Sequence, residues 1–141
     1  MKAKSIMTNK IVVVQKDDMI VDAAKKMKQT GVGTVAVEDQ GKIVGIISDR
    51  DIVLRDVAEN QTPGQSKCGD IMTSNVATAS PESSVDEISQ IMSERQVKRV
   101  PIVEQEHMVG MVSLGDLAQT KGQKREAGSA LKDITSKPGL Q

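Results

Sequence analysis

Aromatic residues are absent from this chain of 141 residues, which also has only one cysteine and one histidine. Without Phe, Trp or Tyr, no base can stack on an aromatic ring, which argues against binding of single-stranded nucleic acid. The 19 basic and 19 acidic residues balance, so no net charge attracts DNA or an anionic membrane surface. The sequence therefore predicts neither a nucleic-acid partner nor a membrane partner.

Long hydrophobic runs and catalytic constellations are also missing. No run spans a bilayer, no signal-peptide pattern opens the chain, and the lone Cys68 excludes an internal disulfide framework, so we expect a cytoplasmic protein. His107 falls in a predicted turn, and no cluster of histidine and cysteine has the spacing of a zinc site. We therefore expect no metal, no catalytic cofactor and no catalytic residue, which favours a binding protein over an enzyme.

An internal duplication is the main positive feature of the sequence. A constant shift that places Asp51 on Asp116 also places the "IMT" at 6–8 on the "IMT" at 71–73, with no gap. Most of the identities are apolar or small, as expected if both copies build the same core. A single copy of about 65 residues buries too little surface to be comfortably stable alone, so we expect the two copies to share one core.

Each copy shows the same order of local patterns: a β-branched run, a helical pattern, two apolar strands joined by a polar turn, and a second helix. Acidic and hydroxyl residues precede both helical patterns ("QKDD" and "SPESS"), as is typical of helix N-termini. The predicted fold class is α/β (α+β), with two tandem β-α-β-β-α repeats. The expected ranges are 10–14, 20–27 and 34–47 in the first copy and 75–79, 85–92 and 99–112 in the second.

Composition also divides the chain into segments. We place repeat 1 at residues 1–60, a polar linker at 61–69, repeat 2 at 70–120, and a loosely ordered C-terminal tail at 121–141.

A Ser-x-x-Asp motif follows the hairpin of each copy, as "SDRD" (48–51) and "SLGD" (113–116). It is typical of a capping box, in which the serine hydroxyl accepts from the N–H three residues on and the acid reaches back to the serine N–H. Aspartate is shorter than the usual glutamate, so we expect a poorer return contact. The alternative is a ribose-phosphate site: a serine and free N–H groups donate to phosphate, and a carboxylate accepts from the ribose hydroxyls. Gly45 and Gly110 would then let a ligand approach the backbone.

The segments "IMT", "VGIISDRDI", "VGMVSLGDL" and "KRVPIVE" resemble cystathionine-β-synthase (CBS) domains. Two tandem copies form a CBS pair, or Bateman module, and the combination of "ISDRDIVLR", "DIMT" and "SLGDLA" is similar to small stand-alone bacterial CBS proteins. The resemblance covers about residues 3–120. It implies two CBS repeats related by pseudo-two-fold symmetry and packed through their sheets, and a homodimer formed through the helices.

The resemblance also implies an adenosyl ligand (AMP, ADP, ATP or S-adenosylmethionine) in the clefts between the copies. By position, Asp51 and Asp116 would hold the ribose, and Ser48 and Ser113 the phosphate. Two cations are candidates for the phosphate. Arg99 lies on a strand that often carries a cation in the family, and Arg50 lies inside the first motif, with a solvent-facing helix residue as its alternative.

The adenine is expected to contact strand backbone and aliphatic side chains, for which ordinary core packing is the alternative. The candidate side chains are Ile11, Val12, Val35, Val76, Val100, Pro101 and Ile102. The family's Gly-to-Pro strand pattern is incomplete in both copies: "VKRVP" lacks the glycine, and "VGTVA" has Ala36 instead of proline. Because the second copy keeps Pro101 and Arg99, we expect its site to be at least as strong as the first.

The predicted function is therefore a regulatory module that binds an adenine nucleotide and signals to a target protein. Most relatives are fused to an enzyme, channel or transporter, and no such domain is evident here, so we expect the target to be a separate, unidentified molecule. The alternative is a ligand-independent dimerisation or assembly protein with vestigial sites, which the incomplete adenine patterns favour.

Overall fold

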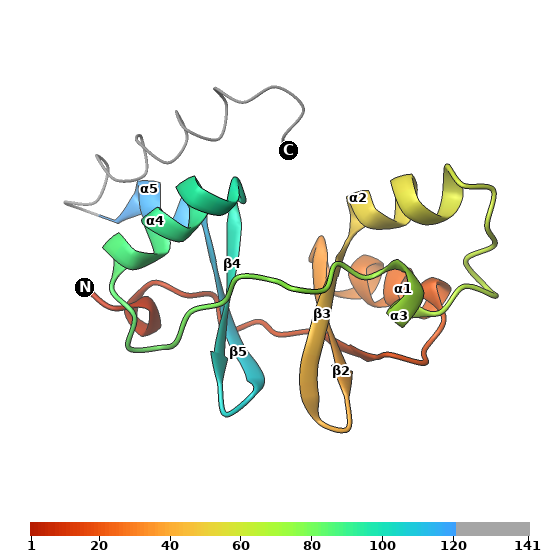
Figure 1. The fold of residues 1–141 in the computed structure, drawn as a ribbon, viewed down its shortest axis with the longest axis horizontal. Coiled ribbons are helices and arrows are strands. Elements are labelled where there is room, and N and C mark those ends of the chain that lie inside the picture. Colours follow the sequence, from red (N-terminus) through yellow and green to blue (C-terminus); the bar gives the residue numbers. More distant parts are fainter. Residues whose placement is uncertain (121–141) are drawn as a thin grey trace. The chain divides into compact units, whose positions relative to one another are not determined.

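Two compact units make up residues 1–120, the part of the chain that the structure, a computed structural model, describes. The first-repeat unit is residues 11–76, and the second-repeat unit combines residues 1–10 with the chain from Ala77 on (Figure 1). The first ten residues therefore belong structurally with the second repeat. The tail predicted at 121–141 lies outside the described residues.

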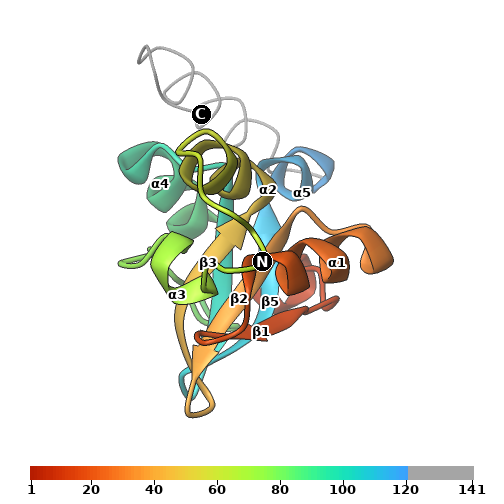
Figure 2. The ribbon, with the colours of Figure 1, turned by 90° about the vertical axis from the view of Figure 1, so that its right-hand side faces the viewer.

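The first-repeat unit contains a three-stranded sheet in the order β1-β2-β3, in which β1 is parallel and β3 antiparallel to β2 (Figure 2). The predicted helix and hairpin are confirmed, and the first strand is displaced a few residues along the chain. The elements are β1 (Val13–Gln15), α1 (Ile20–Thr30), β2 (Thr34–Asp39), β3 (Lys42–Ser48), α2 (Asp49–Asp51), the π-helix η2 (Ile52–Val57) and α3 (Cys68–Ile71).

The second-repeat unit contains a two-stranded antiparallel sheet, β4-β5, with its helix and hairpin as predicted. The strand predicted at 75–79 is wrong: among these described residues Ala79 alone makes a β-bridge, to Ile102. Asn75 has a φ of 59°, which interrupts an extended run. The elements are the 3₁₀-helix η1 (Ala3–Ser5), α4 (Val85–Arg95), β4 (Arg99–Glu104), β5 (His107–Ser113) and α5 (Leu114–Gln119).

The helix starts differ between the units. At α4 the predicted cap is confirmed, because the Ser84 hydroxyl accepts from the N–H of Glu87 at 3.1 Å. At α1 a side-chain cap is not formed, and the carbonyl of Ser66 accepts from the N–H of Ile20 at 2.8 Å. A carbonyl of the polar linker predicted at 61–69 therefore accepts from a backbone N–H in the first turn of α1. The local sequence does not indicate this long-range contact.

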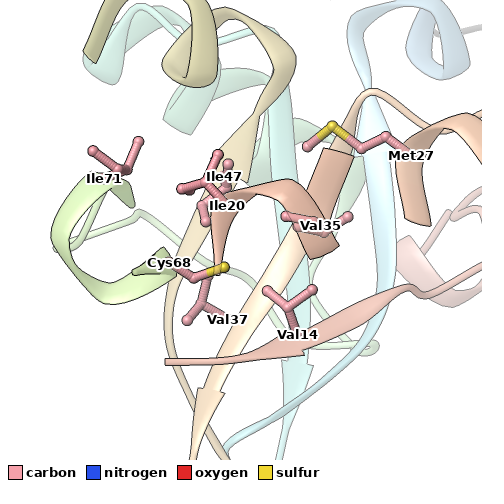
Figure 3. Packing of buried hydrophobic residues seen from close by; sticks show 9 residues of the cluster. Val14, Ile20, Met27, Val35, Val37, Ile47, Cys68 and Ile71 are labelled. Carbon is pink, nitrogen blue, oxygen red and sulfur yellow. The ribbon is translucent and has the colours of Figure 1, made fainter. Parts of the chain in front are cut away.

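The buried aliphatic residues form one cluster in each unit, and Figure 3 shows the cluster of the first-repeat unit. A core shared by the two copies stays a prediction. In the first-repeat unit α1, α3 and the sheet supply Val14, Ile20, Ala23, Met27, Val35, Val37, Ile47, Cys68 and Ile71. In the second-repeat unit η1, α4, the sheet and α5 supply Ala3, Val85, Ile88, Met92, Val100, Ile102, Val112 and Leu117.

Candidate functional site

Both Ser-x-x-Asp motifs form complete capping boxes. The Ser48 hydroxyl accepts from the N–H of Asp51 at 3.1 Å, and the Asp51 carboxylate accepts from the N–H of Ser48 at 2.9 Å. The corresponding distances for Ser113 and Asp116 are 3.1 and 2.8 Å. The expected poor reach of aspartate is wrong, because an extended serine backbone brings its own N–H within range of the shorter acid.

The two "IMT" stretches attach to β3 and β5 in the same way. Thr73 exchanges backbone hydrogen bonds with Ile46 at 2.8 and 3.0 Å, and Thr8 exchanges them with Met111 at 2.8 and 3.1 Å. Each stretch therefore adds backbone to the hairpin that leads into a capping box. The repeated "IMT" in the sequence is the signal for this attachment.

The methionine of each stretch covers a glycine at the equivalent position. A Cβ on Gly45 would lie 2.6 Å from the sulfur of Met72, and a Cβ on Gly110 would lie still closer to the sulfur of Met7. The space that the sequence assigned to an approaching ligand is thus filled by a thioether. These glycines are required by side-chain packing.

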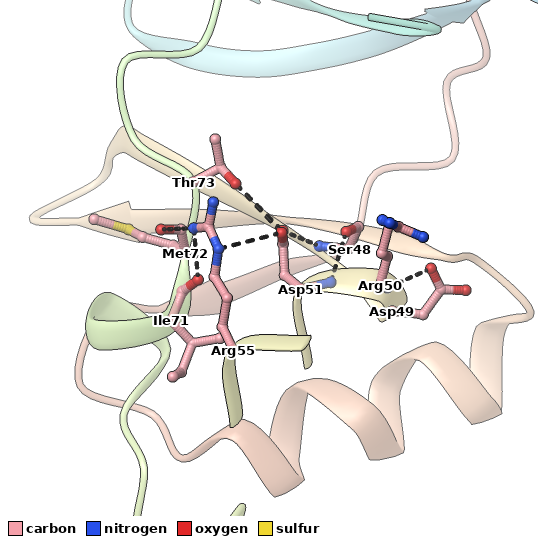
Figure 4. A network of polar contacts seen from close by, with 8 residues as sticks. All are labelled: Ser48, Asp49, Arg50, Asp51, Arg55, Ile71, Met72 and Thr73. Atoms are coloured by element: carbon pink, nitrogen blue, oxygen red, sulfur yellow. Dashed lines mark hydrogen bonds and ion pairs between the residues drawn. The ribbon is translucent and has the colours of Figure 1, made fainter. Parts of the chain in front are cut away.

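The Asp51 carboxylate has further partners that sequence reasoning missed (Figure 4). The Thr73 hydroxyl lies 3.4 and 3.5 Å from its two oxygens, and the Arg55 Nε lies 3.9 Å from Oδ1. Arg55 Nη1 also donates to the carbonyls of Ile71 and Met72, at 3.3 and 3.2 Å. A basic residue four positions after an acid on a helix was the available signal for this ion pair.

The surroundings of Asp116 are different. The residue equivalent to Arg55 is Thr120, whose hydroxyl donates to the backbone carbonyl of Asp116 at 2.9 Å. A pocket of about 310 Å³ adjoins the carboxylate. Its lining residues are Met1, Ser5, Ile6, Asp116, Gln119 and Thr120. The two capping boxes are therefore alike, but their aspartates face different surroundings.

The predicted phosphate-binding cations both lie on the surface. Arg99 begins β4 directly opposite Ser113 in the strand register, so the structure brings these two predicted residues together. Arg50 extends from α2 on the side away from Arg55 (Figure 4). It lines a second pocket, of about 340 Å³, with Asp49, Val53 and Leu54.

The residues predicted to line adenine differ in accessibility. Val35, Val100 and Ile102 are fully buried in the unit cores, as the core alternative predicts, and Pro101 is buried beside them in sequence. Three residues remain partly accessible: Ile11, Val12 and Val76. A role of any of these residues in an adenine pocket stays a prediction.

Cys68 is a free, buried thiol. Burial, and next the carboxylates of Asp18 and Asp22, raise the pKa of this thiol from its ordinary 9.0 to about 11, so it stays protonated and unreactive. Within residues 1–120, no three His, Cys, Asp or Glu side chains gather as metal ligands would. The same part of the chain has no helix with the length and apolarity needed to cross a membrane.

These features define a duplicated α+β module, and a model of the family described as "CBS domain" matches residues 3–57 and again 68–121. The chain therefore belongs to the CBS domain family and is a tandem CBS pair. CBS pairs are regulatory modules, and proteins made of CBS domains alone are generally regulatory rather than catalytic.

The chain is similar to two proteins of Bacillus subtilis (strain 168). It is 39% identical over 132 residues to "CBS domain-containing protein YhcV", and the match covers 94% of each chain. It is 38% identical over 136 residues to "Uncharacterized protein YlbB", and the match covers 95% of this chain and 91% of that protein.

Solved structures with the same fold include Hypoxic Response Protein I with two coordinated zinc ions. It has a TM-score of 0.76 and 27% identity, and the match covers 84% of this chain and 98% of that one. The CBS domain pair of protein MJ0100, in complex with 5′-methylthioadenosine and S-adenosyl-L-methionine, also has a TM-score of 0.76. It is 29% identical, with 88% of this chain and 98% of that one covered.

Proposed function

We propose that this protein is a regulatory, non-catalytic module that binds an adenine nucleotide (AMP, ADP or ATP) or S-adenosylmethionine and signals to a separate target protein. The observation that carries the proposal is the pair of Ser-x-x-Asp capping boxes at equivalent positions of a tandem CBS pair. The adenosyl ligands of the MJ0100 CBS pair support this ligand class. The free, buried thiol of Cys68 suits a cytoplasmic location.

Capping leaves both aspartates able to bind ribose. The N–H of each motif serine is held by Oδ2 alone, and a carboxylate has about four lone-pair positions on its two oxygens. Asp51 and Asp116 would therefore accept from ribose hydroxyls while they cap their helices. Capping and ligand binding are compatible at one residue.

The phosphate would be held by the serine hydroxyls, which accept from an N–H through oxygen and keep their own proton to donate. Arg99 is placed to supply a cation near Ser113, because the two residues are cross-strand partners. Arg50, exposed on α2, would serve the phosphate at Ser48.

We also propose that the protein is a homodimer. The π-helix η2 exposes three apolar side chains, with Val53, Leu54 and Val57 exposed by 56, 45 and 55%. A contiguous exposed apolar surface of this kind supports an interface with another protein surface. A second copy of the chain is the occupant that the family resemblance implies.

Calorimetric titration of AMP, ATP and S-adenosylmethionine tests the ligand proposal. We expect saturable binding to the wild type and at least tenfold weaker binding to Asp116→Ala. The exposed Asp86→Ala variant is the control for charge loss in the same unit. No binding of any of these ligands to the wild type would overturn the proposal and favour a ligand-independent assembly protein.

Absorbance gives an independent check. A protein without Trp or Tyr absorbs very little near 280 nm, so an absorbance peak at 260 nm in a purified sample would report bound nucleotide. Mass spectrometry of the released molecule would then identify it.

A further inference from the structure

The duplication allows the surroundings of the two aspartates to be compared position by position. In the first-repeat unit the Arg55 guanidinium forms an ion pair with Asp51, with 3.9 Å between Nε and Oδ1, and donates to the carbonyls of Ile71 and Met72 at 3.3 and 3.2 Å. Guanidinium N–H groups donate well to carboxylate and carbonyl oxygens. The first-repeat unit therefore contains a filled cation site.

Among residues 1–120, the second-repeat unit has the equivalent acceptors but no equivalent cation. Asp116, Ile6 and Met7 correspond to Asp51, Ile71 and Met72 under the repeat shift. The "IMT" backbone is attached in the same register in both units. By the repeat shift Thr120 corresponds to Arg55, and Asp116 makes no ion pair within residues 1–120.

The position of the pocket agrees with this comparison. The pocket of about 310 Å³ beside Asp116 is lined by Ile6 and Thr120, the equivalents of Ile71 and Arg55. Within residues 1–120, the pocket therefore adjoins the equivalents of the Arg55 acceptors without an equivalent cation.

We propose that this pocket binds the guanidinium or primary ammonium group of a small molecule. The cation contacts the Asp116 carboxylate and the carbonyl oxygens of Ile6 and Met7, as Arg55 contacts their equivalents. The proposal goes beyond the adenine-nucleotide function, because it needs no nucleotide and selects a ligand of the opposite charge to phosphate.

The test is a titration of the full chain with ethylguanidinium chloride, followed by ¹H–¹⁵N correlation spectra. Sodium chloride at the same ionic strength is the reference. We expect saturable shifts of the amides of Asp116, Gln119 and Thr120 with ethylguanidinium only. Equal shifts with both salts, or no saturation, would overturn the proposal, whether or not the protein binds nucleotides.

Matched variants locate the site. Asp116→Asn keeps the shape of the side chain and an acceptor for the cap but removes the charge, so binding should weaken at least tenfold. Asp86→Asn, an exposed change in the same unit, should leave binding intact. Unchanged binding in Asp116→Asn would overturn the proposal.

Exchange of the equivalent residues between the repeats gives a second test that does not alter Asp116. Thr120→Arg supplies the missing cation from the chain itself and should abolish ethylguanidinium binding. Arg55→Ala removes the resident cation and should create a second set of saturable shifts around Asp51. If Thr120→Arg binds ethylguanidinium as the wild type does, the pocket is not the cation site.

Discussion

The surroundings of Asp51 and Asp116 differ although the two motifs have the same capping geometry. Asp51 contacts a hydroxyl and a guanidinium, whereas Asp116 adjoins a pocket of about 310 Å³. Arg55 pairs with Asp51, whereas the equivalent Thr120 bonds the backbone carbonyl of Asp116. The two copies thus share the hairpin and the cap but differ in the residue four positions after the acid.

The largest expected effect concerns the glycines beneath the two methionines. Gly45→Ala should lower the free energy of unfolding by about 2 to 3 kcal/mol and Gly110→Ala by about 1 kcal/mol, because both changes overpack a filled space. The difference arises because a Cβ at Gly45 would also lie 2.8 Å from the backbone carbonyl of Thr73, which cannot rotate away as a thioether can.

Urea unfolding of both variants measures this difference. Gly64→Ala is the control, because nothing lies within 4 Å of a Cβ at that position. It should change stability by less than about 0.5 kcal/mol. Equal losses in Gly45→Ala and Gly110→Ala would contradict the role of the Thr73 carbonyl.

The next largest expected effect is a difference in stability loss between variants of the two aspartates. Asp51→Ala should lower the free energy of unfolding by about 2 kcal/mol and Asp116→Ala by about 1 kcal/mol. Both variants lose a helix cap, but only Asp51→Ala also leaves a guanidinium and a hydroxyl without their carboxylate partner. Thermal or urea unfolding in the absence of ligand measures both, with Asp86→Ala as the exposed control. A larger loss in Asp116→Ala would show that the contacts of Asp51 add no stability.

The exposed helix face gives a prediction about assembly. Val53→Glu places a charge in the apolar surface of η2 and should convert the proposed dimer to a monomer. Ala118→Glu, the equivalent exposed position on α5, should leave the mass unchanged. Light scattering after size-exclusion chromatography distinguishes the two, and a wild type that is already monomeric would exclude the proposed dimer.

The local pattern of apolar and polar residues predicted much of this structure, because helices, hairpins and caps depend on residues that are close in sequence. The "SDRD" and "SLGD" boxes and the hairpins before them follow from side-chain period and hydrogen-bonding chemistry. Contacts distant in sequence were not predictable in this way. Ser66 at the start of α1, and the first ten residues in the second-repeat unit, depend on tertiary packing.

In the candidate site, too, the contacts between residues distant in sequence were not predicted. The motif residues were found by their duplication, but Thr73 and Arg55 reach Asp51 from outside the motif. The wide spacing between "IMT" and Asp51 hides that contact in the sequence. The sequence favours ligand approach at Gly45, because it does not reveal that Met72 lies over this glycine.

The smallest expected effect concerns two equivalent ion-pair clusters at the surface. In the second-repeat unit Lys2 and Lys4 both contact Glu82, whereas in the first-repeat unit Lys67 contacts Asp17 and Gly69 replaces the second lysine. The hydrogen bonds from Lys2, and then from Lys4, lower the pKa of Glu82 from its ordinary 4.5 to about 2. The folded state therefore favours the charged form of this carboxyl.

Because the pKa is lowered on folding, this cluster stabilises the protein above about pH 4.5, and the contribution disappears as the pH falls towards 2. The groups are exposed, so the effect should be small and should weaken with salt. Lys4→Gly, which copies the first repeat, should raise the pKa of Glu82 measured by carboxyl-detected NMR titration, and Lys10→Gly should not. A pKa of Glu82 that is the same in wild type and Lys4→Gly would mean that Lys2 alone holds the N-terminal segment to this carboxyl, as Lys67 alone contacts Asp17.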